Sequence, residues 1–266
     1  DLIKFGSVAI PLVIFCVLGV LILIKLLIKK VPISSKMSYL IAIGTSVCGA
    51  TAIVATAPVI NAKKTEIAYA IANITLFGVI AMLIYPYFAE WYFENDALKT
   101  GLFLGTSIHE TSQVAAAGLI YDQQFNNPET LDVATVTKLI RNTFLVILIP
   151  LFAFLYNRGE FKEQKYSILS IFPYFVIGFI GMIIIRNLGD QLFSVENDSF
   201  YAWSKFIEYL KILATVFLTM AMAAVGISIN LSELKSMGYK PFIVGLIAAV
   251  TVGMISLLYI EILKIF

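Results

Sequence analysis

Long apolar runs, bounded by charges or turn residues, dominate the pattern along this chain. They show no alternation of period two, which argues against a β-barrel, and a continuous stretch such as residues 10–27 suits a helix that must satisfy its own backbone in lipid. About 20 apolar residues cross the hydrocarbon core of a bilayer. The pattern therefore predicts an all-α membrane protein with about eight transmembrane helices, at residues 6–27, 38–60, 67–89, 98–120, 133–156, 168–187, 204–228 and 240–263.

Composition excludes a soluble globule. Of the 266 residues, 60% are hydrophobic and only 14% are charged, and the mean hydropathy is +0.92. A core in water could not hide that much apolar surface, whereas a bilayer accepts it directly. The polar connections are short, so we expect residues 1–266 to form a single polytopic transmembrane domain.

Charge is nearly balanced at +2, which gives no indication of nucleic-acid binding. If all eight segments cross the membrane, the loops alternate between two sides. One side then carries nine basic residues, namely Lys29, Lys30, Lys36, Lys99, Arg158, Lys162, Lys165, Lys235 and Lys240. The other carries six, namely Lys4, Lys63, Lys64, Arg186, Lys205 and Lys264. The positive-inside rule favours the first side as cytoplasmic.

The second predicted span is unusually rich in glycine and hydroxyl residues for an uninterrupted membrane helix. Residues 44–52, Gly-Thr-Ser-Val-Cys-Gly-Ala-Thr-Ala, contain two glycines and three hydroxyl side chains at mid-membrane depth. Such a stretch predicts a broken helix, whose half-helix N-termini would attract an anion and whose carbonyl ends would attract a cation. Close packing of small residues between helices is the alternative explanation.

The fourth predicted span carries the only histidine of the chain. Residues 105–113 read Gly-Thr-Ser-Ile-His-Glu-Thr-Ser-Gln, so His109 and Glu110 lie within a span, with Gln113 one turn further on. Ionisable groups at that depth usually face a cavity or a partner and mark an ion or proton path. The alternative is a structural polar cluster in which Glu110 pairs with a buried basic residue. No second His follows at HExxH spacing, so no zinc site is predicted.

A short internal likeness links these two spans. Gly44-Thr45-Ser46-Val47 and Gly105-Thr106-Ser107-Ile108 share the pattern Gly-Thr-Ser-apolar. Either an internal duplication or a shared solution to close packing accounts for it.

Three further spans hold candidate residues. Lys138 and Arg141 are three residues apart on one face of the fifth span, where they either snorkel to the surface or recognise an anion. In the seventh span, residues 220–228 include Gly226 and Ser228, which either form a second helix break or pack closely. Asn73 in the third span faces either a neighbouring helix or the cavity.

Several motifs, in order along nearly the whole chain, resemble the YeiH-like family, whose members are regarded as sulfate exporters of the bacterial inner membrane. The likeness rests on residues 44–53, where the family pattern reads GxSxCGxSAI, and on Ser107-Ile108-His109-Glu110. It also rests on residues 57–60, 68–72, 76–78, 81–82, 85–86, 113–118, 138–141, 220–226 and 238–242. Thr51 stands where the family has Ser, which keeps the hydroxyl.

The resemblance implies an inverted-repeat secondary transporter. Family members are longer at the N-terminus, and this chain starts at Asp1 without Met or a signal peptide, so we expect the N-terminal spans of its parent to be missing. Related transporters of bile acids, arsenite and riboflavin consist of two inverted five-helix repeats with broken helices that cross at the midplane. By that likeness the second and seventh spans, five spans apart, would be the paired crossovers.

These observations predict a secondary transporter that exports or exchanges a small anion, such as sulfate, a sulfonate or a carboxylate. The expected substrate contacts are Thr45, Ser46, Cys48, Gly49, Thr51, Asn73, Gly226 and Ser228. The expected ion-coupling or path residues are His109, Glu110, Gln113, Lys138 and Arg141. The partners we expect are the anion, a coupling proton or sodium ion and the lipid bilayer, with a homodimer as a further assembly to consider, and with no cofactor, metal or nucleic acid.

A channel is the alternative function, with the glycine-broken segments as a filter and His109 with Glu110 as a gate. A membrane-embedded enzyme that uses Cys48 or His109 is disfavoured. One histidine and two cysteines cannot supply a nucleophile, a base and an orienting group.

Overall fold

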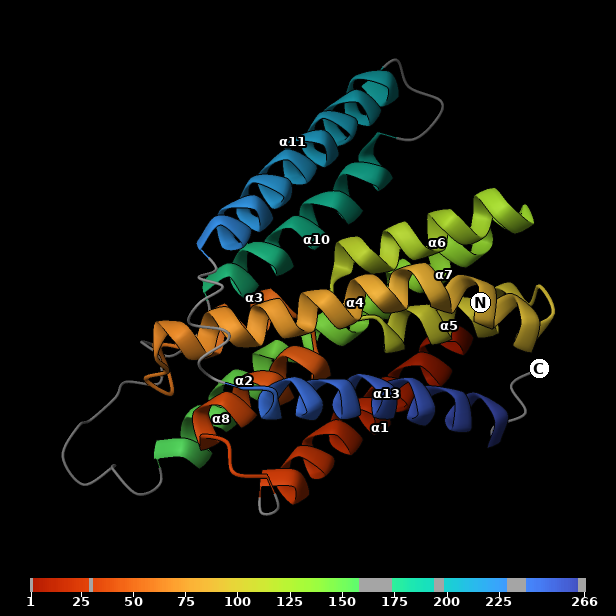
Figure 1. The fold of residues 1–266 in the computed structure, drawn as a ribbon. Coiled ribbons are helices and arrows are strands. Elements are labelled where there is room, and N and C mark those ends of the chain that lie inside the picture. The colour runs from red at the N-terminus through yellow and green to blue at the C-terminus, as the bar shows by residue number, and fades with distance from the viewer. Residues whose placement is uncertain (1, 29–30, 158–173, 194–198, 229–237, 263–266) are drawn as a thin grey trace. The chain divides into compact units, whose positions relative to one another are not determined.

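A computed structural model describes residues 2–28, 31–157, 174–193, 199–228 and 238–262. Every regular element in these ranges is an α-helix, which confirms the predicted all-α class (Figure 1). The chain divides into two compact units. The first comprises Asp1–Ile171 with Leu231–Phe266, and the second is Phe172–Asn230.

Within the part of the chain that the structure describes, four helical segments, all in the first unit, are long and apolar enough to cross a bilayer. Two of them are whole helices, α4 (Lys64–Phe93) and α13 (Lys240–Ile262). The third is Gly6–Leu27, which lies within α1 (Leu2–Ile28). The fourth is Glu129–Phe152, which runs through α7 (Glu129–Thr143) into α8 (Leu145–Asn157). α1 packs against α13, with the Phe15 and Tyr259 ring centroids 5.2 Å apart. The predicted total of eight spans is not confirmed.

The predicted second span is a re-entrant hairpin. α2 (Ser35–Ser46) stops at residues 47–49, and α3 (Ala50–Thr56) then packs back against it, with Ile53 over Gly44. The two ends of the hairpin are neighbours, because Lys36 Nζ donates to the Asn61 carbonyl oxygen over 2.7 Å. Residues 38–60 therefore enter the unit and return to the same end, instead of crossing it.

The predicted fourth span is a second hairpin of the same kind. α5 (Ala97–Ser107) stops at residues 108–110, and α6 (Thr111–Phe125) leads back. Asn127 Nδ2 donates to the Asn95 carbonyl oxygen over 3.0 Å, which holds the two ends of this hairpin together. The physical reason is length: at 1.5 Å per residue, α5 reaches only about half of the roughly 30 Å of hydrocarbon.

The two hairpins enter from opposite ends of the unit, because the 30-residue helix α4 lies between them in the chain (Figure 1). Each hairpin is followed by a long helical segment, so residues 35–93 and 97–157 have the same order of elements in inverted orientation. The two Gly-Thr-Ser-apolar sequences fall at the same structural position, the end of α2 and the end of α5. An internal duplication explains this correspondence directly.

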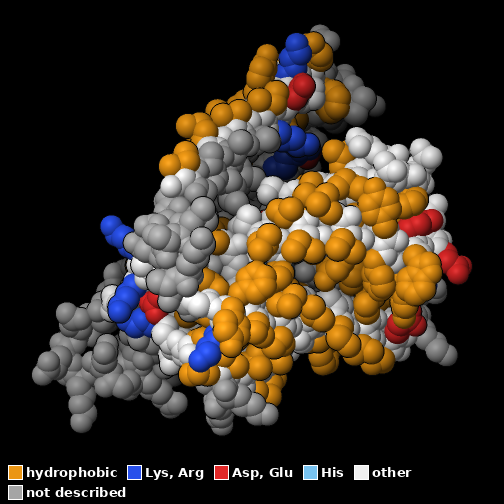
Figure 2. Space-filling view, in the orientation of Figure 1, with side chains coloured by type: hydrophobic (Ala, Val, Ile, Leu, Met, Phe, Trp, Pro, Cys, Tyr) orange, Lys and Arg blue, Asp and Glu red, His pale blue; other side chains and the backbone are white. Residues whose placement is uncertain are grey.

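The hairpins also change which charged residues lie at each of the two ends of the first unit. Because the first hairpin returns, Lys63 and Lys64 lie at the same end as Lys36, while Lys99 lies at the other. Among the described residues, one end of the first unit then carries Lys25, Lys36, Lys63, Lys64, Glu66 and Lys240, and the other carries Lys4, Glu90, Glu94, Asp96, Lys99, Asp122, Glu129, Asp132 and Glu261. Figure 2 shows basic and acidic side chains gathered at opposite ends of this unit. The positive-inside rule predicts the basic end as cytoplasmic.

The second unit contains α10 (Tyr174–Leu192) and α11 (Ser199–Ser228). Asp190 joins them: it accepts from Arg186 Nε over 2.7 Å and from Trp203 Nε1 over 2.8 Å. α11 is one continuous 30-residue helix, so the break expected within residues 220–228 is absent. One glycine costs only about 1 kcal/mol in a helix, and the flanking Ala and Met residues are strong helix formers. The pairing of the second and seventh spans stays a prediction, and within the first unit residues 105–113 form a second interrupted segment that meets residues 44–52.

A cysteine-labelling experiment tests the hairpin topology. Single cysteines at Ser35 and Lys64 should react with a membrane-impermeant maleimide from the same side, and cysteines at Lys99 and Gln124 from the opposite side. Cys16 and Cys48 are buried, so the native background should be low. Labelling of the Ser35 and Lys64 positions from opposite sides would restore a full second span and contradict the hairpin.

Candidate functional site

The tips of the two hairpins meet inside the first unit. The Ala50 N–H at the start of α3 donates to Glu110 Oε1 over 2.5 Å, so the tips are in direct contact. Polar side chains of both tips are buried, with exposed fractions of 1% for His109 and 4% for Glu110. α7 passes beside them and contributes Lys138 and Arg141, both with no exposed surface. We call this cluster the hairpin crossing.

Lys138 holds the carbonyl ends of both tips. Its Nζ donates to Val47 O over 2.8 Å, to Ile108 O over 2.9 Å and to His109 O. An ammonium group has three N–H donors, so all three are used. The lysine thus stabilises the negative C-terminal ends of α2 and α5, whose last carbonyls have no partner within their own helices.

Arg141 makes the same kind of link one turn further along α7. Its Nε donates to Ser46 O over 2.8 Å, and its terminal nitrogens donate to Thr45 O, Thr106 O and, over 3.4 Å, Ile108 O. The predicted snorkelling of Lys138 and Arg141 is therefore wrong. The carbonyl ends of two interrupted helices attract these cations inward, and in this arrangement their donors bind backbone oxygens instead of an anion.

Glu110 performs the complementary role at the N-terminal ends. It is the N-cap residue of α6, and its Oε1 accepts from Ala50 N of α3. Gln113 completes the capping box, with its Oε1 3.4 Å from the Glu110 nitrogen, and its Nε2 donates to Thr75 O in α4 over 3.2 Å. Glu110 therefore links the second hairpin to the N-terminal end of α3, and is not in ion-pair contact with a basic side chain in the described structure.

Several buried polar atoms at the tips have no hydrogen-bond partner among the described residues. They are both ring nitrogens of His109 and the hydroxyl oxygens of Thr45, Ser46 and Ser107. Leaving such a group unsatisfied costs about 1–3 kcal/mol. Natural structures rarely tolerate several in one place unless water, an ion or a ligand completes them.

The structure brings together only some of the predicted site residues. Cys48 lies at the first tip as a buried free thiol, next to Gly49. Asn73 is buried elsewhere: its Nδ2 donates to Pro241 O of α13 over 3.0 Å, so it faces a neighbouring helix. Thr51 is exposed, so it lies outside the buried cluster of the hairpin crossing, and its substrate contact stays a prediction.

Gly226 and Ser228 belong to the second unit, and the surroundings of both lie outside the described part of the structure. They stay predictions.

Two polar links near the crossing were not predicted. Asn142, on α7, donates from Nδ2 to Thr111 Oγ1 over 3.1 Å, and the hydroxyls of Thr106 and Ser256 lie 2.7 Å apart between α5 and α13. Asn142 directly follows Arg141 in the sequence, so its place next to a candidate site residue could have indicated that it lies near the site. A single serine in an apolar span, such as Ser256, gives no such indication.

Gly49 is required at the first tip for two reasons. Its φ of +69° with ψ of −125° is a conformation that L-residues rarely adopt, and a Cβ there would overlap the Glu110 carboxylate. We expect Gly49→Ala to destabilise the protein by at least the 1–3 kcal/mol typical of such backbone strain. Gly181→Ala in α10 is the matched control, because a Cβ there meets nothing within 4 Å. Equal melting temperatures for the two variants in detergent would contradict this role.

Removal of the Lys138 ammonium should be more damaging still. Lys138→Met keeps the length of the side chain but removes the lysine's donors from Val47 O and His109 O, at about 1–3 kcal/mol each, and leaves Ile108 O with only the 3.4 Å bond from Arg141. We expect a loss of roughly 3 kcal/mol or more, measured as a fall in thermal stability and in the yield of monodisperse protein. Lys64→Met, at an exposed lysine, should change neither quantity. A Lys138→Met protein as stable as wild type would show that the carbonyls do not depend on it.

Comparison with known proteins places the chain in a family. A family model described as "Conserved hypothetical protein 698" matches residues 1–245. A UPF0324 membrane protein of Fusobacterium nucleatum is 36% identical over 272 residues, which cover 100% of this chain and 78% of that protein. UPF0324 membrane proteins of Streptococcus agalactiae and Streptococcus pyogenes are 35% and 34% identical, each covering 95% of this chain and 72% of the relative.

No solved structure matches the chain. The names of the relatives agree with the multi-pass membrane location predicted from the sequence. With a family match over most of its length and relatives above 30% identity across nearly all of it, this chain belongs to the conserved hypothetical protein 698 family of UPF0324 membrane proteins.

Proposed function

We propose that the protein is a secondary transporter that moves a small anion across the bacterial inner membrane. One observation carries this proposal: two re-entrant hairpins enter from opposite ends and meet at interrupted helices in the interior. Inverted repeats with discontinuous helices at the midplane are the usual architecture of a secondary transporter's binding site. Non-helical backbone at that depth is tolerated only where protein buries it or where it lines a cavity.

The electrostatics of the crossing support an anion as substrate. The N-terminus of α3 donates to the carboxylate of Glu110, the N-cap residue of α6, so this position already accepts a negative oxygen. In their ordinary ionisation states Lys138, Arg141 and Glu110 together carry one net positive charge. The unpartnered hydroxyls of Ser46 and Ser107 could donate to the oxygens of an oxyanion.

Glu110 suits a coupling role because it occupies the place that a substrate anion would take. Protonation of its carboxylate would weaken its hydrogen bond to the N-terminus of α3, and a substrate anion could then bind that N–H group without changing the net charge of the site. The carbonyl ends, which could otherwise hold a sodium ion, are bound by Lys138 and Arg141. This arrangement favours a proton over sodium as the coupling ion.

The substrate range follows from the same chemistry. An anion with two or three acceptor oxygens fits the available donors, so sulfate, a sulfonate or a carboxylate are the candidates. The likeness to YeiH-like proteins suggests sulfate, but the described side chains contain nothing that selects it over the other two.

Transport assays in proteoliposomes test the proposal. Radiolabelled sulfate, sulfonates and dicarboxylates are offered under an imposed pH or sodium gradient. We expect saturable accumulation of one anion, driven by the pH gradient. Glu110→Gln, which imitates a permanently protonated carboxyl group, should abolish accumulation driven by the gradient while anion exchange at equal pH continues.

Glu66→Gln is the matched control, because Glu66 is also a buried capping-box glutamate but lies at the start of α4, away from the crossing. The Glu66→Gln variant should still accumulate the anion only when a pH gradient is imposed. A Glu110→Gln protein with wild-type dependence on pH would remove Glu110 from coupling. Flux that dissipates gradients without saturating would favour the channel instead.

A further inference from the structure

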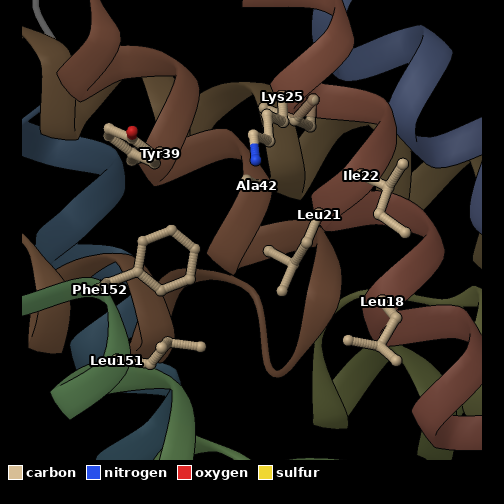
Figure 3. Close-up of a pocket in the computed structure, with 9 residues that line it drawn as sticks. Leu18, Leu21, Ile22, Lys25, Tyr39, Ala42, Leu151 and Phe152 are labelled. Carbon is tan, nitrogen blue, oxygen red and sulfur yellow. The ribbon is translucent and has the colours of Figure 1, made fainter. Parts of the chain in front are cut away.

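A second, separate site lies on the outside of the first unit. An open cavity of about 280 Å³ is lined by α1, α2 and α8 near the basic end of the unit. Its lining is almost wholly apolar apart from two side chains, the ammonium of Lys25 and the phenol of Tyr39. Figure 3 shows Lys25 reaching across the cavity toward Ala42, above Leu21 and Phe152. We call this cavity the Lys25 groove.

The groove opens on a surface that suits lipid tails. Its α1 wall is formed by Leu18, Leu21 and Ile22, and the exposed fractions of Leu18 and Ile22 are 50% and 59%. Exposed apolar side chains continue along α1 at Phe15 and Leu26, so this face needs an apolar environment. The opposite wall is fixed, because the Tyr39 and Phe152 rings pack edge to face with centroids 5.6 Å apart.

Lys25 lies at the depth of a lipid headgroup. It is in the last turn of α1, at the end where the basic residues gather. Leu18 is seven residues earlier, which puts it about 10 Å deeper along the helix axis. Among the described residues Lys25 has neither a hydrogen bond nor an ion pair, so its charge has no protein counter-ion in that part of the chain.

We propose that the Lys25 groove binds an anionic glycerophospholipid of the leaflet at the basic end. The phosphate pairs with the Lys25 ammonium, and the upper part of one acyl chain lies between α1 and α8 over Leu18 and Leu151. Tyr39 adds an amphipathic side chain at the headgroup level, where tyrosines are enriched in membrane proteins. The positive-inside rule predicts this leaflet as the cytoplasmic one, where a lysine near the surface attracts anionic lipids.

The site has a structural consequence. α2 is the first arm of the re-entrant hairpin, and Ala42, two residues before Gly44, lines the groove. A lipid bound there therefore contacts the outer side of the helix whose carbonyl end Lys138 and Arg141 hold. This proposal concerns the surface of the unit, so it does not depend on the protein being a transporter.

Native mass spectrometry of the purified protein tests the site. The protein is exposed to phosphatidylglycerol and phosphatidylcholine with identical acyl chains. We expect the wild type to retain phosphatidylglycerol several-fold more than phosphatidylcholine. Lys25→Met should bring the two lipids to parity, and Leu21→Trp, which fills the groove, should reduce retention of both.

Lys64→Met is the control for overall charge, because it removes an exposed lysine at the same end and should leave the preference unchanged. A Lys25→Met protein with the wild-type preference would mean that Lys25 only snorkels, and would overturn the proposal. Equal retention of both lipids by the wild type would overturn it too. Melting temperatures of all variants show whether they are folded.

Discussion

The hydrogen bonds from two buried cations to the carbonyl ends of interrupted helices are the interaction on which the first unit depends. A bilayer offers no water to backbone groups, so a helix that stops halfway must find partners within the protein. Lys138 and Arg141 supply seven such bonds to residues of both tips. Because they are three residues apart on one face of α7, a single helix holds both hairpins in register.

Side chains, and not a continuous backbone, hold the crossing together. The first tip is joined to the second by α7 and by the contact from Ala50 to Glu110, while the hairpins themselves enter from opposite ends. Links of this kind can be broken and remade by a proton or an anion without unfolding a helix. That property distinguishes the crossing from an ordinary packed core, where only shape holds the elements.

Much of the chemistry of the crossing could be predicted from the sequence. The glycines and hydroxyls of residues 44–52 indicated a broken helix, and the depth of His109 and Glu110 indicated a polar interior site. Hydropathy alone could not distinguish a hairpin from a span. An apolar segment of about 22 residues has the same composition whether it crosses once or enters and returns, and the turn is decided by contacts between its ends, such as Lys36 with Asn61.

The roles of the charged residues were harder to foresee, because they depend on partners distant in the sequence. Lys138 is 91 residues from Val47. The groups that it binds are main-chain oxygens, which every residue has, so the residue types in the sequence do not indicate them. The sequence does show basic residues near a polar loop, which favoured snorkelling. Glycine breaks were equally ambiguous: Gly49 ends a helix because its φ is positive, whereas α11 runs unbroken past Gly226.

The internal likeness explains why the crossing is asymmetric. Aligning Gly44-Thr45-Ser46 with Gly105-Thr106-Ser107 places Gly49 opposite Glu110, and both are the N-caps of their second half-helices. Two carboxylates at these positions would repel each other, and there is no room for a second one, since a Cβ at Gly49 would already meet the Glu110 side chain. One glutamate is therefore the N-cap residue of α6 and also accepts from the N-terminus of α3, and the equivalent position has to be glycine. A symmetric pair of hairpins thereby acquires one carboxylate, that of Glu110, where the two tips meet.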